Sequence, residues 1–338
     1  MKYFRSSIII TIIGFAIAFI FLGGASALYV VFLLSILEVT LSFDNAVVNA
    51  KVLETMNPIW QKRFILYGIP IAVFGMRFLF PIVIVAVAGG LGVIDTFFMA
   101  LNNPHEYHKT LEGAGQYIYA FGGAFLLMVF LDFLFDENRQ IKWFKPLECN
   151  TFIRKIACAQ HTETIIATAI GLSLIYNVDL EVSRGVALAY FTGILLHSLI
   201  ITFDELLSTN GIRSGIMGFL YLEVLDASFS FDGVIGAFAL SSDIFIIMIG
   251  LGIGAMFVRS LTLYMVAKQT LNEYKYLEHG AHYAIAALAV IMFVKIFTSH
   301  INEIVVGTIG ILFVGMAVGH SMWEKRKGIV EDDEECNC

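Results

Sequence analysis

Two hydrophobic segments of membrane length in this chain carry the same pattern of carboxylic acids. The first reads Glu38-Val-Thr-Leu-Ser-Phe-Asp44-Asn45, and the second reads Asp226-Ala-Ser-Phe-Ser-Phe-Asp232-Gly233. In both, an acid is followed six residues later by the aspartate of Ser-Phe-Asp. A charged side chain at the centre of a bilayer costs roughly 3 kcal/mol or more, so such residues pair with one another or serve an ion pathway. The repeated pattern therefore predicts a cation site built by an internal duplication.

The composition indicates an all-α polytopic membrane protein. Of 338 residues, 58% are hydrophobic and only 14% are charged, whereas a soluble domain has about 25% charged residues. Mean hydropathy is +0.81. Helices satisfy their own backbone hydrogen bonds in lipid, which makes them the expected spanning element. The net charge of −7 comes largely from the acidic C-terminal tail and from acids within the hydrophobic segments. The sequence has no Lys/Arg-rich stretch that would indicate binding to nucleic acid.

We predict about ten transmembrane helices, each near the length of about 20 residues that crosses a bilayer. With the N-terminus inside, sixteen of the 21 Lys and Arg residues fall in inner segments and two, Lys109 and Arg184, fall in outer segments. Because cytoplasmic loops are enriched in Lys and Arg, this bias predicts insertion in the cytoplasmic (inner) membrane with both termini cytoplasmic. The predicted spans are 8–22, 28–50, 64–88, 114–135, 162–177, 185–204, 214–239, 243–266, 281–298 and 304–320.

The first span is expected to be retained as an uncleaved signal anchor. Ala25-Ser26-Ala27 resembles a signal-peptidase site, so cleavage is the alternative. The tail ends in Cys336 and Cys338, which leave a soft-metal site open as an alternative to a disordered segment. The predicted organisation is an N-terminal helix (1–24), a first three-helix repeat (25–135), a cytoplasmic loop (136–161), two linking helices (162–213), a second repeat (214–299), a last helix (300–322) and an acidic tail (323–338).

The similarity between the two halves extends over three helices. An arginine lies nine residues after a glycine in the third and eighth spans, and a Leu-Glu pair precedes the fourth and ninth spans. Because the second span runs inwards and the seventh runs outwards, the two three-helix repeats are inverted, an architecture typical of secondary transporters. Chance similarity among hydrophobic helices is the alternative. The matching residues are Gly68 and Arg77 with Gly250 and Arg259, and Leu111-Glu112 with Leu277-Glu278.

The acidic helices carry a set of hard oxygen ligands. Helical geometry, at about 100° per residue, places Ser42 and Asn45 on one stripe with Glu38, whereas Asp44 points about 120° away. Two explanations stay open. Either each Ser-Phe-Asp aspartate faces a different neighbouring helix, or the helix is interrupted there, since Ser, Phe, Asp, Asn and Gly are mediocre or poor helix formers. Carboxylate and amide oxygens suit Mg²⁺, Ca²⁺ and Mn²⁺.

Three basic residues, Arg77, Arg259 and Lys295, also lie within predicted spans. We expect ion pairs between them and the acids. An arriving cation must then displace a basic partner or a proton, which offers a route to coupling. Two histidine-containing features are weaker candidates: His197 in the sixth span, and His105-Glu-Tyr-His108, which is expected in an outer loop.

The acidic motifs resemble those of the TerC family of integral membrane proteins. The first family motif, an acid followed by a short spacer and Asp-Asn, corresponds to Glu38 with Asp44-Asn45-Ala46, and the second corresponds to Glu223, Asp226, Phe229 and Asp232. Gly233 and Gly236 depart from the Ser and Pro of that motif. The resemblance covers about residues 25–300 and implies a metal-ion transporter, with relatives linked to manganese efflux. The site that it implies comprises Glu38, Asp44, Asn45, Glu223, Asp226 and Asp232.

These observations lead us to expect a transporter rather than an enzyme. The expected activity is secondary export of a divalent cation, with Mn²⁺ as the expected ion and Ca²⁺ as an alternative, bound as substrate without a prosthetic group. The expected partners are the ion and the lipid bilayer, and association into a homo-oligomer is left as an open alternative. One alternative is a non-transporting scaffold of a metal or tellurite stress-resistance system. The other is an intramembrane aspartyl protease built on the two Ser-Phe-Asp aspartates, in which Glu38, Glu223, Asp226 and both arginines would have no role.

Overall fold

The fold is all-α in the part of the chain that the structure, a computed structural model, describes. That part comprises residues 3–136, 139, 141–148, 161–207, 215–238, 240–241, 243–298, 301 and 303–327, and it contains helices but no strand. A few side chains within these ranges, including that of Asp232, are not described. Most of the predicted cytoplasmic loop and the end of the acidic tail, with all four cysteines, also lie outside the described residues.

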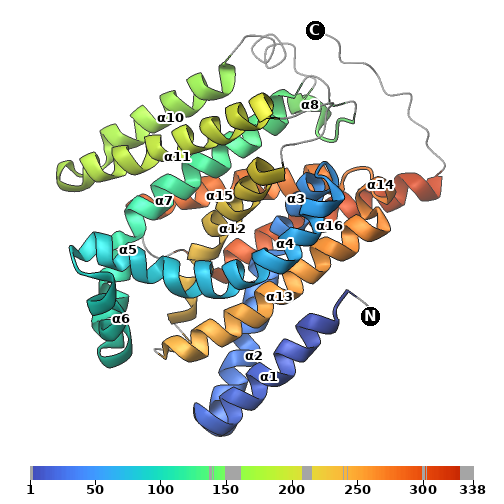
Figure 1. Cartoon of the computed structure of the whole chain (residues 1–338). Helices are drawn as coiled ribbons and strands as arrows, with labels where there is room; N and C mark the ends of the chain where they lie inside the picture. The colour runs from blue at the N-terminus through green and yellow to red at the C-terminus, as the bar shows by residue number, and fades with distance from the viewer. Residues whose placement is uncertain are drawn as a thin grey trace.

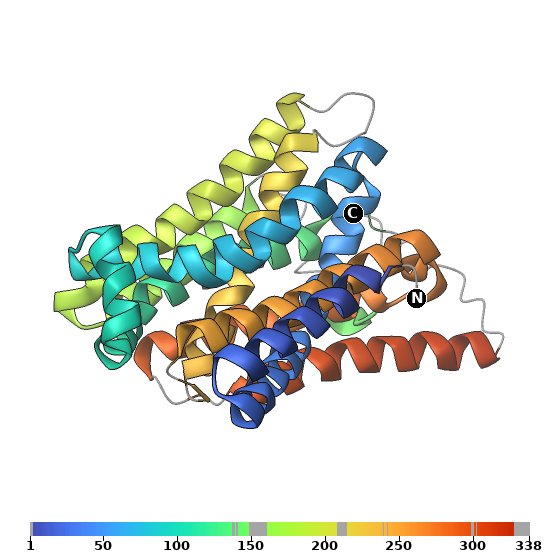
Figure 2. The same cartoon turned by 60° about the horizontal axis from the view of Figure 1, so that its bottom comes forward.

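Several long helices, among them α7, α11, α13 and α16, run lengthwise through the molecule, whereas α6 and α12 are inclined to them (Figures 1 and 2). The first turn of α1 and the last turn of α16 lie at the same end in both views. The helices are α1 (Arg5–Phe21), α2 (Gly24–Leu41), α3 (Phe43–Glu54), α4 (Pro58–Pro70), the π-helix η1 (Ile71–Leu79), α5 (Phe80–Gly89), α6 (Val93–Asn102), α7 (Pro104–Phe135), α8 (Lys145–Glu148), α10 (Thr162–Asn177), α11 (Leu180–Leu207), α12 (Gly215–Phe238), α13 (Ile244–Lys268), α14 (Thr270–Glu273), α15 (Leu277–Phe297) and α16 (Glu303–Lys327).

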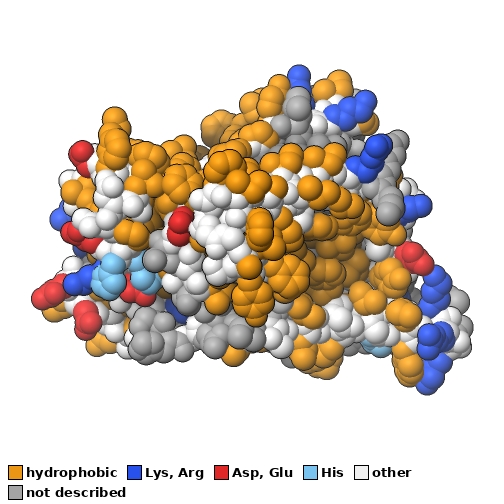
Figure 3. All heavy atoms as spheres, turned by 90° about the horizontal axis from the view of Figure 1, so that it is seen from below, with side chains coloured by type: hydrophobic (Ala, Val, Ile, Leu, Met, Phe, Trp, Pro, Cys, Tyr) orange, Lys and Arg blue, Asp and Glu red, His pale blue; other side chains and the backbone are white. Residues whose placement is uncertain are grey.

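Length and composition make this chain a polytopic membrane protein. Six helices, α2, α7, α11, α13, α15 and α16, are long and apolar enough to cross a membrane. Large apolar side chains such as Ile20, Val87 and Ile165 are exposed on helix surfaces, and hydrophobic side chains cover much of the face in Figure 3. A continuous exposed apolar surface of this kind marks contact with a partner or a membrane. Most Lys and Arg side chains on that face gather toward its right-hand end.

Each of the ten predicted spans coincides with a helix or a helical run. The four that do not count among the six long apolar helices are α1, the run α4–η1–α5, α10 and α12. Helix α12 has sufficient length, 24 residues, but carries Glu223, Asp226 and Asp232. Ten crossings therefore stay a prediction, whereas several crossings are supported directly.

The second predicted span is interrupted, and the interruption is not duplicated. Helix α2 ends at Leu41 and α3 begins at Phe43, with Ser42 at φ −108° and ψ 17° between them. One of the two explanations left open by the sequence thus holds for this helix. The matching Ser-Phe-Asp of the second half lies within α12, which is continuous from Gly215 to Phe238. The predicted span 28–50 therefore consists of two helices, α2 and α3, and not of one.

The segment expected to be an outer loop is helical. Helix α6 occupies part of it, and α7 begins at Pro104, a residue suited to the first helical position because its φ is already fixed. His105 and His108 consequently lie in the first turns of α7, where His108 Nε2 is 3.2 Å from Glu112 Oε1. The expectation of a loop at His105–His108 is wrong because a proline that begins a helix resembles, in sequence, a proline in a turn.

Arg77 lies in a π-helical segment within a continuous helical run from Pro58 to Gly89. The segment η1 follows directly after Pro70, which has no N–H to donate to the preceding turn. Segments of π-helix are rare and occur often at functional sites. The widened turn changes the direction in which Arg77 leaves the helix, which the 100° rule for an α-helix does not predict.

The acidic helices and the arginine-bearing helices contact one another across the two halves of the chain. Acidic α3 packs on α15, and acidic α12 packs on α7; α13 with Arg259 packs on α2, and η1 with Arg77 packs on α12. In addition, α7 packs on α15 and α13 packs on η1. Two hydrogen bonds show that α2–α3 runs parallel to α13: they join Ser35 to the carbonyl of Gly250 and Thr262 to the carbonyl of Ala46.

Close packing of α11 on α7 depends on a glycine. An added Cβ at Gly193 would lie 2.5 Å from the carbonyl oxygen of Phe121, a backbone atom that cannot turn aside. We expect Gly193→Ala to lower the free energy of unfolding by about 1–3 kcal/mol, the usual cost of overpacking. Thermal unfolding in detergent measures this. Gly113→Ala on α7 is the control, because an added Cβ there meets nothing within 4 Å; equal melting temperatures for both variants would contradict the prediction.

Candidate functional site

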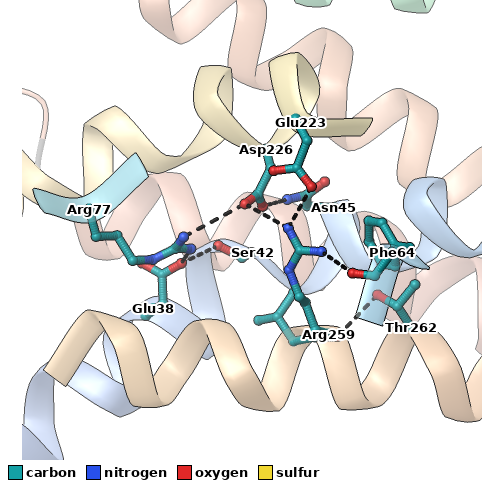
Figure 4. A network of polar contacts seen from close by, with 10 residues as sticks. Glu38, Ser42, Asn45, Phe64, Arg77, Glu223, Asp226, Arg259 and Thr262 are labelled. Carbon is teal, nitrogen blue, oxygen red and sulfur yellow. Dashed lines mark hydrogen bonds and ion pairs between the residues drawn. The ribbon is translucent and has the colours of Figure 1, made fainter. Parts of the chain in front are cut away.

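A network of charged side chains lies buried where the two halves of the chain meet (Figure 4). Four separate elements supply it: Glu38 from α2, Arg77 from η1, Glu223 and Asp226 from α12, and Arg259 from α13. Each of these side chains is less than a tenth exposed. Buried charges at this depth require partners, and each of them has at least one.

Arg77 joins the acidic helices of the two halves. Its Nη2 donates a hydrogen bond to Glu38 Oε1, and its Nη1 lies 3.7 Å from Asp226 Oδ2. Ser42, at the break between α2 and α3, donates to the same Glu38 oxygen at 3.0 Å. The first arginine is thus held by one acid from its own half and reaches one from the other half.

Arg259 is held on several sides. Its Nη2 donates to Glu223 Oε1 at 3.1 Å and lies 3.9 Å from Asp226 Oδ2. Its Nη1 donates to the carbonyl of Phe64 at 3.2 Å, and the guanidinium lies 4.3 Å from the centroid of the Phe64 ring. A guanidinium over an aromatic face is attracted by the ring quadrupole. The contacts orient Arg259 toward α12.

Asp226 is the carboxylate that both arginines share. Its Oδ2 faces both guanidiniums, and its Oδ1 accepts a 2.8 Å hydrogen bond from Asn45 Nδ2 of α3. The network contains three carboxylates, those of Glu38, Glu223 and Asp226, and two guanidiniums, so its formal charge is −1. The network is therefore nearly, but not fully, neutralised by the arginines.

Two amide oxygens beside the network are buried and have no hydrogen-bond partner among the described residues. They are Asn45 Oδ1 and Asn49 Oδ1, four residues apart on α3. Such spacing puts both on one face of the helix. Since most buried polar atoms are paired, each exception calls for an explanation, and a missing water or ion is one of them. Both are uncharged amide oxygens, which hard cations such as Ca²⁺ take as ligands.

The structure brings four of the six predicted metal residues together: Glu38, Asn45, Glu223 and Asp226. Asp44 lies apart from them. It is buried, accepts a hydrogen bond from the Asn45 N–H at 3.0 Å, and faces α16, where an added Cβ on Gly310 would lie 3.5 Å from its carboxylate. This placement follows the sequence alternative in which the aspartate faces a different neighbour. The side chain of Asp232 lies outside the described residues.

Two further predicted residues lie outside the network. Lys295 is buried on α15, with its amine 5.5 Å from the centroid of the Tyr119 ring on α7. His197 on α11 has its Nε2 3.2 Å from Asp132 Oδ2 of α7. Neither contact was evident from the sequence, because each depends on which helices become neighbours.

Sequence reasoning missed the glycines that make room for the network. An added Cβ at Gly68 would lie 2.6 Å from Cζ of Arg259, and one at Gly254 would lie 2.6 Å from Cγ of Glu38. The repeated spacing between Gly68 and Arg77 was the available signal. Its interpretation needed the structure, because Gly68 accommodates the arginine of the other half and not its own.

The carboxylates are arranged around guanidiniums and not around a metal ion. Within the described part of the chain, no group of three or more His, Cys, Asp or Glu side chains is placed to hold a metal. The arginines occupy the positions beside Glu38, Glu223 and Asp226 that a bound cation would need. A cation could therefore reach these carboxylates only if an arginine moved away from them.

The sequence profile of one protein family matches residues 43–328, which is most of the chain. The chain belongs to that family, described as Protein of unknown function (DUF475). The DUF475 match begins at the first residue of α3 and includes Arg77, Asp226 and Arg259, whereas Glu38 precedes it. No curated protein and no solved structure matches the chain. The likeness of the acidic motifs to those of TerC proteins stays an interpretation of the sequence.

Removal of one member of a buried ion pair should destabilise the protein more than removal of both. We expect Arg259→Met to lower the free energy of unfolding by about 3–5 kcal/mol, because Glu223 is then left buried without its partner. The double variant Arg259→Met/Glu223→Gln should recover much of that loss. Unfolding in mixed micelles titrated with sodium dodecyl sulfate measures the cycle.

The exposed pair between Lys325 and Glu273, 3.4 Å apart, provides the control. Lys325→Met should cost less than about 1 kcal/mol, as is usual for a surface ion pair. A double variant that is no more stable than Arg259→Met would show that the two network residues do not depend on each other.

Proposed function

We propose that this chain is a secondary transporter that exports a divalent metal cation, with Mn²⁺ as the expected substrate. One observation carries the proposal: two buried arginines lie among three carboxylates on membrane-buried helices and leave one negative charge uncompensated. Intramembrane charges are costly and are commonly found on ion pathways. The resemblance of the acidic motifs to TerC proteins points the same way.

The distances suggest where the cation would enter the network. Arg77 is closest to Glu38, and Arg259 is closest to Glu223, whereas both lie at 3.7–3.9 Å from Asp226. The contacts of Asp226 are the weakest Coulombic contacts of the network because they are the longest. A cation that approaches Asp226 therefore displaces the arginines from their shared acid first and leaves each arginine its own acid.

The donor set favours a hard cation. Carboxylates from Glu38, Glu223 and Asp226 and the amide oxygens of Asn45 and Asn49 are oxygen ligands, which suit Mn²⁺, Ca²⁺ and Mg²⁺. Within this proposal the metal is cargo, and no prosthetic group or enzymatic step is required. The expected location is the cytoplasmic membrane, with the Lys/Arg-rich end of Figure 3 facing the cytoplasm.

The helix packing supports the proposed inverted repeat. Under a two-fold relation between the halves, the acidic helix of each half should pack on the Leu-Glu helix of the other. The pairs α3 with α15 and α12 with α7 follow this rule. The arginine helices follow it too, since α13 packs on α2 and η1 packs on α12. Rocking of such repeats about a central site is the usual basis of alternating access.

A non-transporting membrane scaffold is the second candidate. Two observations favour it. The carboxylates already have arginine partners. Among the described residues, no group of three or more His, Cys, Asp or Glu side chains is placed to hold a metal ion. A scaffold would retain the network solely for assembly. The intramembrane protease alternative requires the two Ser-Phe-Asp aspartates, Asp44 and Asp232, to share a proton, and it gives no role to Asp226 or to the two guanidiniums beside it.

Flux through reconstituted protein separates transporter from scaffold. In proteoliposomes that contain a metal-sensitive dye, we expect Mn²⁺ flux by the wild-type protein and a loss of at least about tenfold in Asp226→Asn, which corresponds to about 1.4 kcal/mol of lost stabilisation of the ion. Asp179→Asn, which changes an exposed acid at the other end of the bundle, should transport normally. Absence of flux in wild-type protein under imposed proton and potential gradients would favour the scaffold.

If the arginines neutralise the carboxylates when no metal is bound, removing one arginine should strengthen metal binding. We expect Arg77→Gln to bind Mn²⁺ more tightly than wild type, because the ion no longer competes with a guanidinium, and to export it more slowly. Isothermal titration calorimetry measures the first effect and proteoliposome flux the second. Arg63→Gln is the control, since Arg63 is exposed and lies over the Trp60 ring. Unchanged or weaker binding in Arg77→Gln would exclude competition.

A further inference from the structure

A cavity of about 250 Å³ lies beside the C-terminal ends of α3 and α7, and α11, α12 and α15 also line it. Val48 of α3 and Tyr221 of α12 line it. Val48 lies three residues from Asn45 on α3, and Tyr221 lies two residues from Glu223 on α12. The polar residues that line it are Lys51, Thr55, Asp132, Asp136, Glu278 and His282.

The cavity has a net negative charge. Asp132, Asp136 and Glu278 contribute three carboxylates, and Lys51 contributes one ammonium, which pairs with Glu278 at 2.8 Å. With neutral histidines the formal balance is −2. A cleft whose lining carries an excess of negative charge between low-dielectric walls attracts cations.

His282 supplies a nitrogen donor in a fixed orientation. Its Nδ1 lies 2.8 Å from the carbonyl oxygen of Glu278, so this nitrogen carries the proton and donates it, and Nε2 keeps its lone pair. The ring stacks on Phe133 with centroids 3.9 Å apart and is 7% exposed. Within the described residues no partner contacts Nε2. Histidines that bind metals are typically oriented by such a bond from the other ring nitrogen.

The donor types indicate the class of ion. An imidazole nitrogen together with carboxylates suits divalent transition metals better than Ca²⁺ or Mg²⁺. The side chains do not converge on a single coordination centre, so the ion would keep much of its water shell. Six waters at about 30 Å³ each occupy roughly 180 Å³, which the cavity accommodates.

The helix α3 contributes both to the cavity lining and to the network. Asn49 Oδ1 and Asn45 Oδ1 are buried, unpaired and four residues apart on α3, and the Asn45 side chain also contacts Asp226. They are oxygen ligands on the same helix as the cavity-lining residues Val48 and Lys51.

We infer that the cavity lined by Asp132, Asp136, Glu278 and His282 is a second cation site, a vestibule that captures a hydrated divalent transition-metal ion before it enters the network. This inference rests on the proposed export function for its role in transport. The binding itself does not depend on turnover, so the two can be tested separately.

Binding of Co²⁺ and Mn²⁺ to purified full-length protein tests the vestibule. The visible spectrum of Co²⁺ reports ligation by imidazole, and calorimetry with Mn²⁺ counts sites. We expect His282→Gln to lose the imidazole-dependent Co²⁺ spectrum and to weaken one class of Mn²⁺ sites by about tenfold. His105→Gln, an exposed histidine at the opposite end, should bind as wild type does. Identical spectra for wild type and His282→Gln would overturn the inference.

A second variant guards against misfolding of His282→Gln. Asp136→Asn removes a negative charge at the exposed end of α7 without altering the stack on Phe133, and it should weaken the same class of sites. Thermal unfolding establishes that each variant is folded. Unchanged Mn²⁺ binding in a folded Asp136→Asn would count against a charge-based vestibule.

Asp226→Asn distinguishes failure of the vestibule from failure of the export proposal. The imidazole-dependent spectrum should persist in this variant while the second class of sites is lost. A spectrum lost together with Asp226 would show a single site and overturn the vestibule. A persistent spectrum combined with no flux in wild-type protein would support the vestibule while refuting export. In active protein, His282→Gln should raise the Mn²⁺ concentration for half-maximal flux with little change in maximal rate.

Discussion

The structure depends on the sharing of Asp226 between two buried arginines. Each arginine has an acid of its own, Glu38 or Glu223, and both reach toward the same third carboxylate. Removing either arginine leaves its carboxylate uncompensated away from water, which is strongly destabilising. The arrangement therefore fixes how α2, η1, α12 and α13 pack, and the glycines at 68 and 254 allow the side chains to approach.

The first half of the chain is more irregular than the second. A break at Ser42 divides α2 from α3, and the arginine of that half lies in a π-helix, whereas α12 and α13 are continuous. Irregular backbone within a membrane is tolerated where it is buried in protein or lines a polar cavity. The irregular positions here are next to the network, where buried polar side chains accompany the interrupted backbone.

The sequence was sufficient for the class of fold and for the principal charged residues. Hydrophobic length and the Lys/Arg bias located every helix that later proved long and apolar, and the rarity of charge in such helices pointed to Glu38, Asp226 and both arginines. The direction of Asp44 could not be derived, because it depends on α16 as a neighbour and on the break at Ser42. The helix at His105–His108 was missed because a single proline signals both a turn and a helix start.

A network already filled by arginines is compatible with transport only if the guanidiniums can retreat without leaving a charge unpaired. The geometry satisfies this condition, since Arg77 keeps Glu38 and Arg259 keeps Glu223 and the Phe64 carbonyl when Asp226 is released. Asp226 then faces Asn45, whose oxygen is buried and unpaired. The shared carboxylate is thus the member of the described network with the longest arginine contacts, and under the proposed export mechanism it is the one that exchanges partners first.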